Sequence, residues 1–370
     1  MKFLFKFYPT GSFMFSGETS LQSPKNKVKG FLSEDPLSRK REAFIVTSEK
    51  LPPQTTIMGA IRYLLLQHSG FKLGTPEAES LIGKNTFRLE EPEDMGIIKE
   101  IGPVMITGNI GDEKSRLFLL PAPLDHQENN NSSSQYTPRE KYNPKDSEYQ
   151  GFMAWYEEGD SAARHQNCCY PEDFLFITYK QALHATTEEG TQRDDKSFHM
   201  QERVRLIDKK LAPRGKGLLS NPAFCVEVDL DDKNQKELIS SLDQLKTFVS
   251  LGGRESTFKV EIEKFPIILK FNENKPESKK FYLLSPTWLP EDWRNKYGLE
   301  MAYLNKRRLR GAKSEITGDK VSLKLNSNRF IFADAGSVFI FREHNEMEKF
   351  RNKIEENKLR IGGFNRTAEL

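Results

Sequence analysis

The sequence predicts an α+β protein of two ferredoxin-like (RRM-like) domains, with a long insertion in the first. Over residues 1–270, apolar segments follow the order strand, helix, two strands, helix, strand, which defines this fold. A shorter run of similar segments follows over residues 275–370. Each run contains a glycine pair just beyond an amphipathic segment, and this correspondence indicates a degenerate internal repeat.

The first strand and helix have clear boundaries. Residues 2–8 combine aromatic and aliphatic side chains, and a turn at residues 9–11 follows. Pro52 and Pro53 lead to two threonines that suit a helix N-terminus. Apolar residues at helical spacing then predict a helix that ends by Gly70.

Residues 71–200 do not continue this pattern and are interpreted as the insertion. Within it, residues 126–150 are too polar to pack, which predicts a mobile surface segment. Order is expected to resume at residues 174–179. Residues 202–208 and 223–230 then read as two strands of one hairpin.

The last helix and strand of the first domain follow Asp231 and Asp232. The apolar positions that share one face at helical spacing are Leu238, Ile239, Leu242, Leu245, Phe248 and Val249. The glycine pair at 252–253 ends this predicted helix, and residues 257–262 alternate as a half-buried strand does.

The second domain is predicted from its own strands and a late helix. The expected strands are 281–284, 321–325, 329–333 and 337–341, with a mixed polar segment up to Arg310. Residues 344–357 carry apolar side chains at helical spacing and precede the second glycine pair.

Composition sets broad limits on function. The chain has 370 residues and a formal net charge of +3, so a polyanionic partner must be recognised by local clusters. Three cysteines without metal-ligand spacing argue against a disulfide framework, a structural metal or another cofactor. An apolar run long enough to cross a membrane is lacking, so we expect a soluble, cytoplasmic protein.

Two kinds of feature could bind RNA. Glycine pairs can turn backbone N–H groups toward a phosphate, although an ordinary helix C-cap gives the same pattern. The pairs are Gly252 with Gly253 and Gly362 with Gly363, each with an arginine nearby, Arg254 and Arg366. Basic clusters could follow a phosphate backbone or form surface ion pairs instead. They comprise Arg203, Arg205, Lys209, Lys210, Arg214 and Lys216, and, further on, Lys306, Arg307, Arg308, Arg310 and Lys313.

Aromatic and histidine residues give weaker indications. Phe13, Phe15 and Phe31 could stack on bases, although most phenylalanines must lie in the core. Catalytic motifs are missing, so we expect no enzyme activity. The alternative is a metal-independent ribonuclease, with His68 or His199 as the general base.

Several segments together resemble one family. They are FYPTGSFMFSGE (7–18), PPQTTIMGAIRYLLL (52–66), RVRLIDKKLAPRGKGLL (203–219), LGGRES (251–256), SPTWLP (285–290), AGSVFIF (335–341) and RIGGFN (360–365). In this order they resemble the RAMP superfamily of CRISPR effector proteins, and within it the third subunit of the Cmr, or type III-B, complex.

The resemblance implies a non-catalytic, antiviral-defence ribonucleoprotein subunit that holds the 5′ repeat-derived tag of the CRISPR RNA. It also implies docking against the large signalling subunit and the backbone RAMP subunits. Carried to this sequence, it makes the two glycine loops with Asn365 and the basic hairpin the leading RNA contacts. Arg62, in the GAIR segment, either contacts RNA or holds its helix to the sheet. The remaining alternatives are a CRISPR-RNA-processing endoribonuclease and an assembly adaptor without RNA contact.

Overall fold

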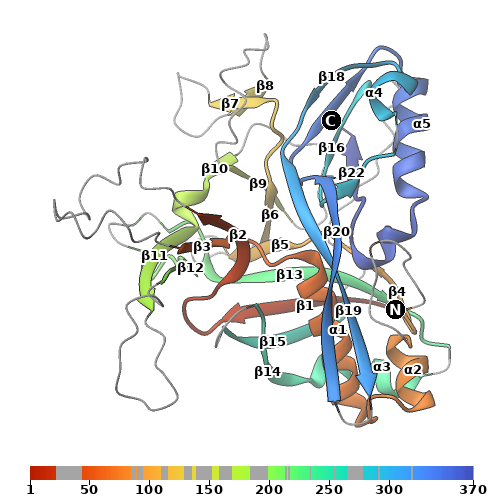
Figure 1. Cartoon of the computed structure of the whole chain (residues 1–370). Helices are drawn as coiled ribbons and strands as arrows, with labels where there is room; N and C mark the ends of the chain where they lie inside the picture. The colour runs from red at the N-terminus through yellow and green to blue at the C-terminus, as the bar shows by residue number, and fades with distance from the viewer. Residues whose placement is uncertain are drawn as a thin grey trace.

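The computed structural model describes residues 1–21, 44–84, 89, 95–109, 116–128, 136–138, 152–157, 169–183, 199–212, 215, 217–233, 235–252, 256–264, 278–290, 292–317 and 320–369. In this part of the chain two sheets lie between two helices, so that helix, sheet, sheet and helix form four layers (Figure 1).

The larger sheet is built around β1 (Lys2–Pro9). This strand pairs antiparallel with β13 (Ser220–Leu230) on one side and β15 (Thr257–Lys264) on the other. The described strand order is β10-β9-β6-β5-β13-β1-β15-β14, and β4 also pairs with β13. The other strands are β4 (Ile98–Ile101), β5 (Met105–Asn109), β6 (Arg116–Pro121), β9 (Phe152–Glu157), β10 (Cys169–Pro171) and β14 (Lys246–Ser250).

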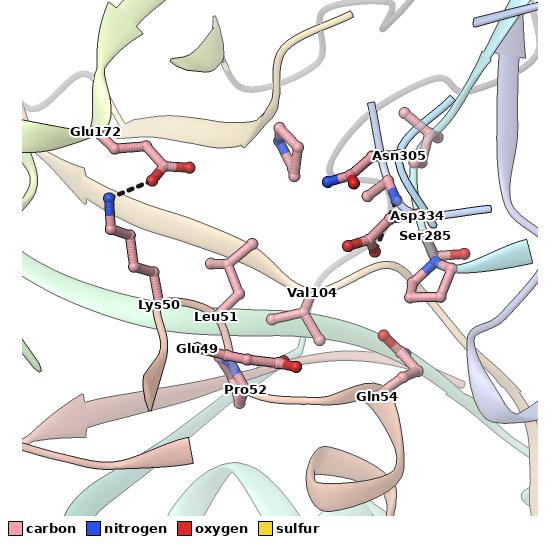
Figure 2. A pocket seen from close by; sticks show the side chains of 14 residues that line it. Glu49, Lys50, Leu51, Pro52, Gln54, Val104, Glu172, Ser285, Asn305 and Asp334 are labelled. Atoms are coloured by element: carbon pink, nitrogen blue, oxygen red, sulfur yellow. Dashed lines mark hydrogen bonds and ion pairs between the residues drawn. The ribbon is translucent and has the colours of Figure 1, made fainter. Parts of the chain in front are cut away.

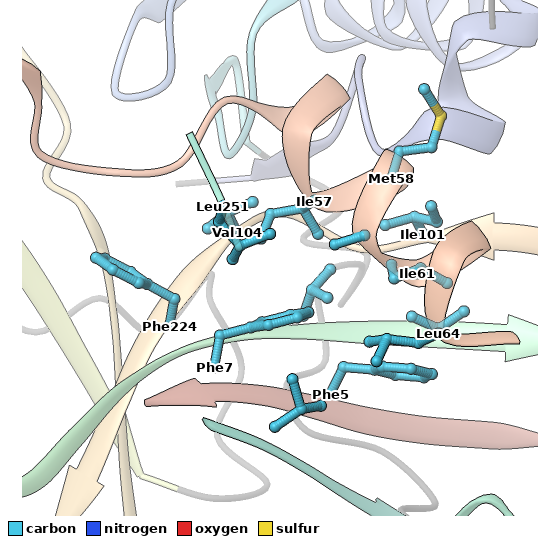
Figure 3. Packing of buried hydrophobic residues seen from close by; sticks show 14 of the residues in the cluster. Phe5, Phe7, Ile57, Met58, Ile61, Leu64, Ile101, Val104, Phe224 and Leu251 are labelled. Atoms are coloured by element: carbon cyan, nitrogen blue, oxygen red, sulfur yellow. The ribbon is translucent and has the colours of Figure 1, made fainter. Parts of the chain in front are cut away.

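Helix α1 (Gln54–Ser69) covers one face of this sheet (Figure 3). Phe5 and Phe7 of β1 point toward Ile57 and Ile61 of the helix, and all four side chains are buried. Each such burial is worth roughly 1.5 to 3 kcal/mol. The helix ends at Gly70, as predicted, and α2 (Pro76–Ile82) follows it.

The smaller sheet has the order β18-β21-β16-β22. Its strands are β16 (Lys280–Leu283), β18 (Leu299–Tyr303), β21 (Val338–Phe341) and β22 (Thr367–Glu369). Helix α5 (His344–Glu355) packs Met347, Phe350 and Ile354 on its outer face, beside the short α4 (Trp293–Lys296). The 3-10 turn η8 (Lys358–Gly362) connects α5 to β22.

The inner faces of the two sheets pack on each other. Leu4 and Cys225 of the larger sheet share one buried cluster with Tyr282, Val338 and Ala368 of the smaller sheet. The period of two in each strand explains this arrangement, because alternate residues face the helix on one side and the second sheet on the other.

Smaller sheets flank these layers. One has the order β11-β12-β3-β2, from β2 (Phe15–Leu21), β3 (Phe44–Glu49), β11 (Phe176–Leu183) and β12 (His199–Leu206). The 3-10 turn η4 (Glu172–Phe174) precedes β11. A long hairpin of β19 (Lys306–Thr317) and β20 (Lys320–Ala333) pairs with β17 (Thr287–Trp288), and β7 (His126–Glu128) pairs with β8 (Tyr136–Pro138).

The antiparallel sheets and their helices confirm the predicted α+β class. The strands predicted at 2–8, 257–262, 281–284 and 337–341, and the two main helices, are found. The two-domain ferredoxin-like arrangement stays a prediction, as do the domain boundaries. Most of the segment predicted to be mobile, 126–150, lies outside the described residues.

The helix predicted to end at the first glycine pair is wrong. Only α3 (Lys236–Ser240) is helical, the turn η7 (Leu242–Gln244) follows, and β14 pairs with β15. The apolar positions fit a helical period up to Leu242, but Lys246–Ser250 alternates with a period of two. As a result Val249 is buried, while Phe248 faces outward and is 60% exposed.

Two other strand predictions need correction. Residues 202–208 and 223–230 do not form one hairpin: β12 pairs with β11 and β3, and β13 belongs to the larger sheet. Residues 321–325 and 329–333 form one strand, β20, and its partner β19 begins inside the segment read as mixed and polar. In the first case strand pairing decided the outcome, and local patterns do not record it. In the second case the polar residues of β19 concealed a hairpin between neighbouring segments.

Candidate RNA-binding surface

The N-terminal turn, residues 10–14, joins three of the segments predicted to bind RNA. Arg203 of β12 donates from Nε to the Ser12 hydroxyl at 3.0 Å and from Nη2 to the Ser12 carbonyl at 2.6 Å. The Met14 amide donates to the Ser256 hydroxyl at 3.0 Å, at the end of the first glycine loop. The basic strand and the first glycine loop, distant in sequence, therefore meet at the end of β1.

The cations of the predicted basic hairpin, residues 203–216, have different roles: one holds the N-terminal turn and others are exposed to solvent. Arg203 is half-buried because its guanidinium holds this turn. Arg205, Lys209 and Lys210 are exposed, on β12 and in the turn after it. Arg214 and Lys216 lie outside the described residues. The exposed cations are therefore the part of this cluster that can reach a phosphate.

The first glycine loop is open to solvent at Gly252, which has φ +78°. A Cβ there would overlap the Met14 carbonyl and come within 2.9 Å of the Phe15 ring. Glycine is thus required for close approach to the N-terminal turn as well as for the left-handed backbone. Gly253 and Arg254 lie outside the described residues.

The second glycine loop lies in the interior. Gly362 and Gly363 are buried, and Asn365 is fully buried, accepting from the Trp288 amide at 3.0 Å and donating to the Ile354 carbonyl at 3.1 Å. Arg366 binds Glu100 and donates to the Ile101 carbonyl at 2.5 Å. Asn365 thus ties this loop to β17 and α5, and Arg366 ties it to β4 of the larger sheet, while contact of these four residues with RNA remains a prediction.

Arg62 also has a partner within the chain. Its Nη2 donates to the carbonyl of Gly83 at 3.2 Å, the residue that ends α2, and burial lowers the pKa of this guanidinium. Of its two predicted roles, the structure documents the holding of its helix, although to α2 and not to the sheet.

The aromatic prediction is wrong where it can be examined. Phe13 and Phe15 are 1% and 0% exposed and stack within the main core, so they are not available to bases. Phe31 lies outside the described residues. The exposed aromatic that sequence reasoning missed is Phe248, because the predicted helix placed it on a buried face.

The candidate histidines have different environments. His68 lies near the end of α1, and its Nε2 is 2.9 Å from the Ser241 hydroxyl and 3.2 Å from the Leu238 carbonyl. These contacts tie α1 to the α3 segment, so His68 has a structural role in this part of the fold. His199 begins β12, opposite Leu183 and Phe44.

A pocket of about 200 Å³ lies between the segment before α1 and the connections that follow β16 and β20 (Figure 2). Its lining includes the carboxylates of Glu49, Glu172 and Asp334 and only one ammonium, Lys50, which binds Glu172 at 2.5 Å. Three negative groups against one positive group disfavour a phosphate. The RNA backbone is therefore expected on the exposed cations and not in this pocket.

A family comparison bears on the segment that contains α1. The sequence model of the family described as CRISPR-associated protein (Cas_Cmr3) matches residues 33–155, which are 123 of the 370 residues. The chain resembles the Cmr3 family. The resemblance first stated from scattered motifs is thus confirmed, and the Cmr3 match supports a type III-B CRISPR effector subunit.

Comparisons with other proteins add little detail. No curated protein matches the chain. A chain in the cryo-EM structure of the Type III-B Cmr-beta bound to cognate target RNA is 12% identical, with a TM-score of 0.47 over 98% of this chain and 95% of that one. A chain in the cryo-EM structure of the Type III-B Cmr-beta bound to cognate target RNA and AMPPnP, state 1, is 12% identical, with a TM-score of 0.48 over 96% of this chain and 89% of that one.

Within the described residues, no group of His, Cys, Asp and Glu side chains could hold a metal ion. Among the same residues, no helix is long and apolar enough to cross a membrane.

Proposed function

We propose that this chain is the cytoplasmic, non-catalytic RNA-binding subunit of a type III-B CRISPR effector complex, and that it holds the 5′ repeat-derived tag of the CRISPR RNA. The match of residues 33–155 to the Cmr3 family carries this proposal. The chain also docks the large signalling subunit and contacts the backbone RAMP subunits, as the resemblance implies.

The strand order supports the ferredoxin-like interpretation of both domains. In the larger sheet, β5-β13-β1-β15 places the four strands in the chain order second, third, first, fourth. The smaller sheet repeats this order as β18-β21-β16-β22. RNA-binding modules of this kind present a sheet and adjoining loops to single-stranded RNA.

The RNA contacts proposed here are the exposed cations Arg205, Lys209 and Lys210 beside the Gly252 loop. Lysine and arginine side chains attract the backbone, while backbone N–H groups of the glycine loop can bind a phosphate. The neighbouring turn is fixed by Arg203 and Ser256, so the surface is ordered before RNA binds.

Purification of the assembled complex tests the proposal. The tagged chain is co-expressed with its genomic neighbours, and any RNA that co-purifies is sequenced. We expect several subunits and short RNAs that share one 5′ end. A complex without RNA would contradict the proposal.

Charge reversal then tests the residues. Substitution R205E/K209E/K210E should reduce RNA crosslinking to this chain by about tenfold, because three phosphate contacts are lost. The matched control K349E/K353E/K358E reverses three exposed lysines on and after α5 and should leave crosslinking unchanged. Equal crosslinking in wild type and both variants would favour the adaptor without RNA contact.

A cleavage assay addresses catalysis. Repeat RNA incubated with the chain in the absence of added metal should remain intact. Cleavage that H199A or H68A abolishes would favour the endoribonuclease alternative.

A further inference from the structure

The inner face of the larger sheet is only partly covered by the smaller sheet. Leu4, Met105 and Cys225 lie under the smaller sheet, in strands β1, β5 and β13. Toward the β14 edge the same face carries polar, cationic and aromatic side chains. This second area needs an explanation of its own, because sheet-on-sheet packing does not account for it.

One cross-strand row defines this area. Tyr8 of β1 lies opposite Lys259 of β15, and Lys259 lies opposite Phe248 of β14. The three side chains share one face, since their neighbours Phe7, Phe258 and Val249 are buried in the α1 side of the core. Lys259 Nζ lies 5.9 Å from the centre of the Tyr8 ring, within the range of a cation–π contact.

Phe248 is the residue that packing explains least. It is 60% exposed, on the last described strand of the sheet. Among the described residues, no ring contact of Phe248 is found, while its neighbour Val249 is buried. An exposed aromatic ring on an open sheet face gives a base a surface to stack on.

The charges beside this row leave a net positive balance. The next row on the same face is Lys6, Glu261 and Lys246, and Arg116 binds Glu263 at 3.0 Å close by. Counting Lys259, four cations face two carboxylates; Lys6 and Lys259 are ion-paired with Glu261, and Arg116 with Glu263. Lys246 is exposed, and within the described part of the chain its ammonium makes no hydrogen bond or ion pair.

This area, the Tyr8–Lys259–Phe248 row, is continuous with the surface described above. Pro9 pairs with Phe258 at the end of β1, and the Thr10 hydroxyl donates to the Thr257 carbonyl at 3.0 Å. The chain then reaches Ser12, which Arg203 binds. Gly252, just after β14, follows Phe248 by only four residues.

We propose that the Tyr8–Lys259–Phe248 row is a stacking site for single-stranded RNA, with one base on Phe248 and phosphates beside Lys246 and Lys259. The inference rests on the proposed function and locates where the RNA leaves the glycine loop. Tyr8 and Phe248 are two strand spacings apart, about 10 Å, so splayed nucleotides can contact both.

Ultraviolet crosslinking of the co-expressed complex tests the row. Trypsin releases residues 247–254 as one peptide, and mass spectrometry assigns the crosslinked residue within it. We expect a base crosslinked to Phe248. F248L, which keeps apolar volume but loses the ring, should lower crosslinked RNA on this chain at least fivefold, and F248Y should retain it.

The matched control is Y63A. Tyr63 lies on α1, is 54% exposed and belongs to the opposite side of the sheet, so its loss should not alter crosslinking. Folding of the F248L chain is checked by thermal melting, because an exposed position should change stability little.

The other outcomes separate the two proposals. RNA retained by the complex, with crosslinks elsewhere and no effect of F248L, would overturn the stacking site and leave the proposed function standing. Loss of a protein subunit from the F248L complex, with RNA retained, would identify a protein-docking face and also overturn it. A wild-type complex without RNA would overturn both.

Discussion

The two glycine loops occupy equivalent places in the chain but have different surroundings. The first follows β14 and precedes β15 of the larger sheet; the second lies at the end of η8 and precedes β22 of the smaller sheet. Gly252 is exposed, whereas Gly363 is buried against Gln54 of α1 and Gly102, which follows β4. A glycine pair therefore lies on an open surface in one case and at an internal joint in the other.

The main helices differ in the same way. In chain order the long helix α1 lies between β1 and β5 of the larger sheet, and only the short α3 lies between β13 and β15. Around the smaller sheet the short α4 lies between β16 and β18, and the longer α5 lies between β21 and β22. The second loop leaves α5 toward the larger sheet, where Arg366 and Arg360 both bind Glu100.

The largest effect is expected at the buried joint. Replacing Arg366 by Met leaves the Ile101 carbonyl and Glu100 without this donor and should lower the free energy of unfolding by about 3 kcal/mol. Urea unfolding measures the change. The control R205M alters an exposed arginine and should change it by less than about 0.5 kcal/mol. Equal losses would contradict the contrast between the loops.

Gly363→Ala should lower the free energy of unfolding slightly less, by about 2 to 3 kcal/mol. Its φ of +85° disfavours a side chain, and a Cβ would overlap the Gln54 amide and lie 2.8 Å from the Gly102 carbonyl. Gly70→Ala is the matched control, since Gly70 has φ +71° and open space around its Cβ position. Thermal melting of both variants separates the effect of the Cβ overlap from that of backbone strain. An equal fall in melting temperature would show that the overlap does not contribute to the loss of stability.

The pH dependence of stability should reflect the same joint. Burial alone would raise the pKa of Glu100, but Arg366 and Arg360 outweigh it and lower the pKa below its usual value. The ionised carboxylate therefore stabilises the fold above about pH 5, and this contribution is lost as pH falls through the lowered pKa.

E100Q removes this contribution. Because Glu100 is partly exposed, we expect a loss of only about 1 kcal/mol at pH 6 that shrinks toward pH 3. Urea unfolding at several pH values measures it. If the free energies of unfolding of wild type and E100Q differ by the same amount from pH 6 to pH 3, the joint is not stabilised by the ionised carboxylate.

The smallest stability effect is expected at the open surface. R205E/K209E/K210E should shift the free energy of unfolding by less than about 0.5 kcal/mol. Its effect belongs to RNA binding: the slope of log affinity against log salt should fall by about 2, since each single-strand phosphate contact contributes about 0.7. A large loss in the free energy of unfolding, with an unchanged salt dependence of RNA affinity, would contradict the assignment of open and buried loops.

Local sequence patterns predicted elements best where the period was long and uniform. Sixteen residues of α1 and the alternating β15 were predicted correctly, because each segment buries one face throughout. The segment 236–250 failed because it changes from a helical to a strand period within a few residues. That failure also hid Phe248, because Phe248 and Val249 are adjacent apolar residues and only the pairing of β14 with β15 shows which of them is buried.

The sequence predicted which residues belong to the candidate site, but it did not predict which of them are exposed. Arg203, Arg205 and Arg366 are equivalent in sequence as arginines near strands, yet one holds a turn, one is exposed and one is buried. Residues brought together from β1, β12 and the 251–256 segment form the surface, and their pairing spans some 190 to 240 positions of the chain.

The sequence by itself determined the α+β class, the main helices, the strands β1, β13, β15, β16 and β21 and the resemblance to Cmr3 proteins, since these follow from local period and motif order. Only the tertiary structure decided which glycine loop is open, which arginines are free and which side chains remain on the uncovered sheet face. The physical reason is that burial depends on what packs against a residue, and here the second sheet covers one part of the first and leaves the β14 edge exposed.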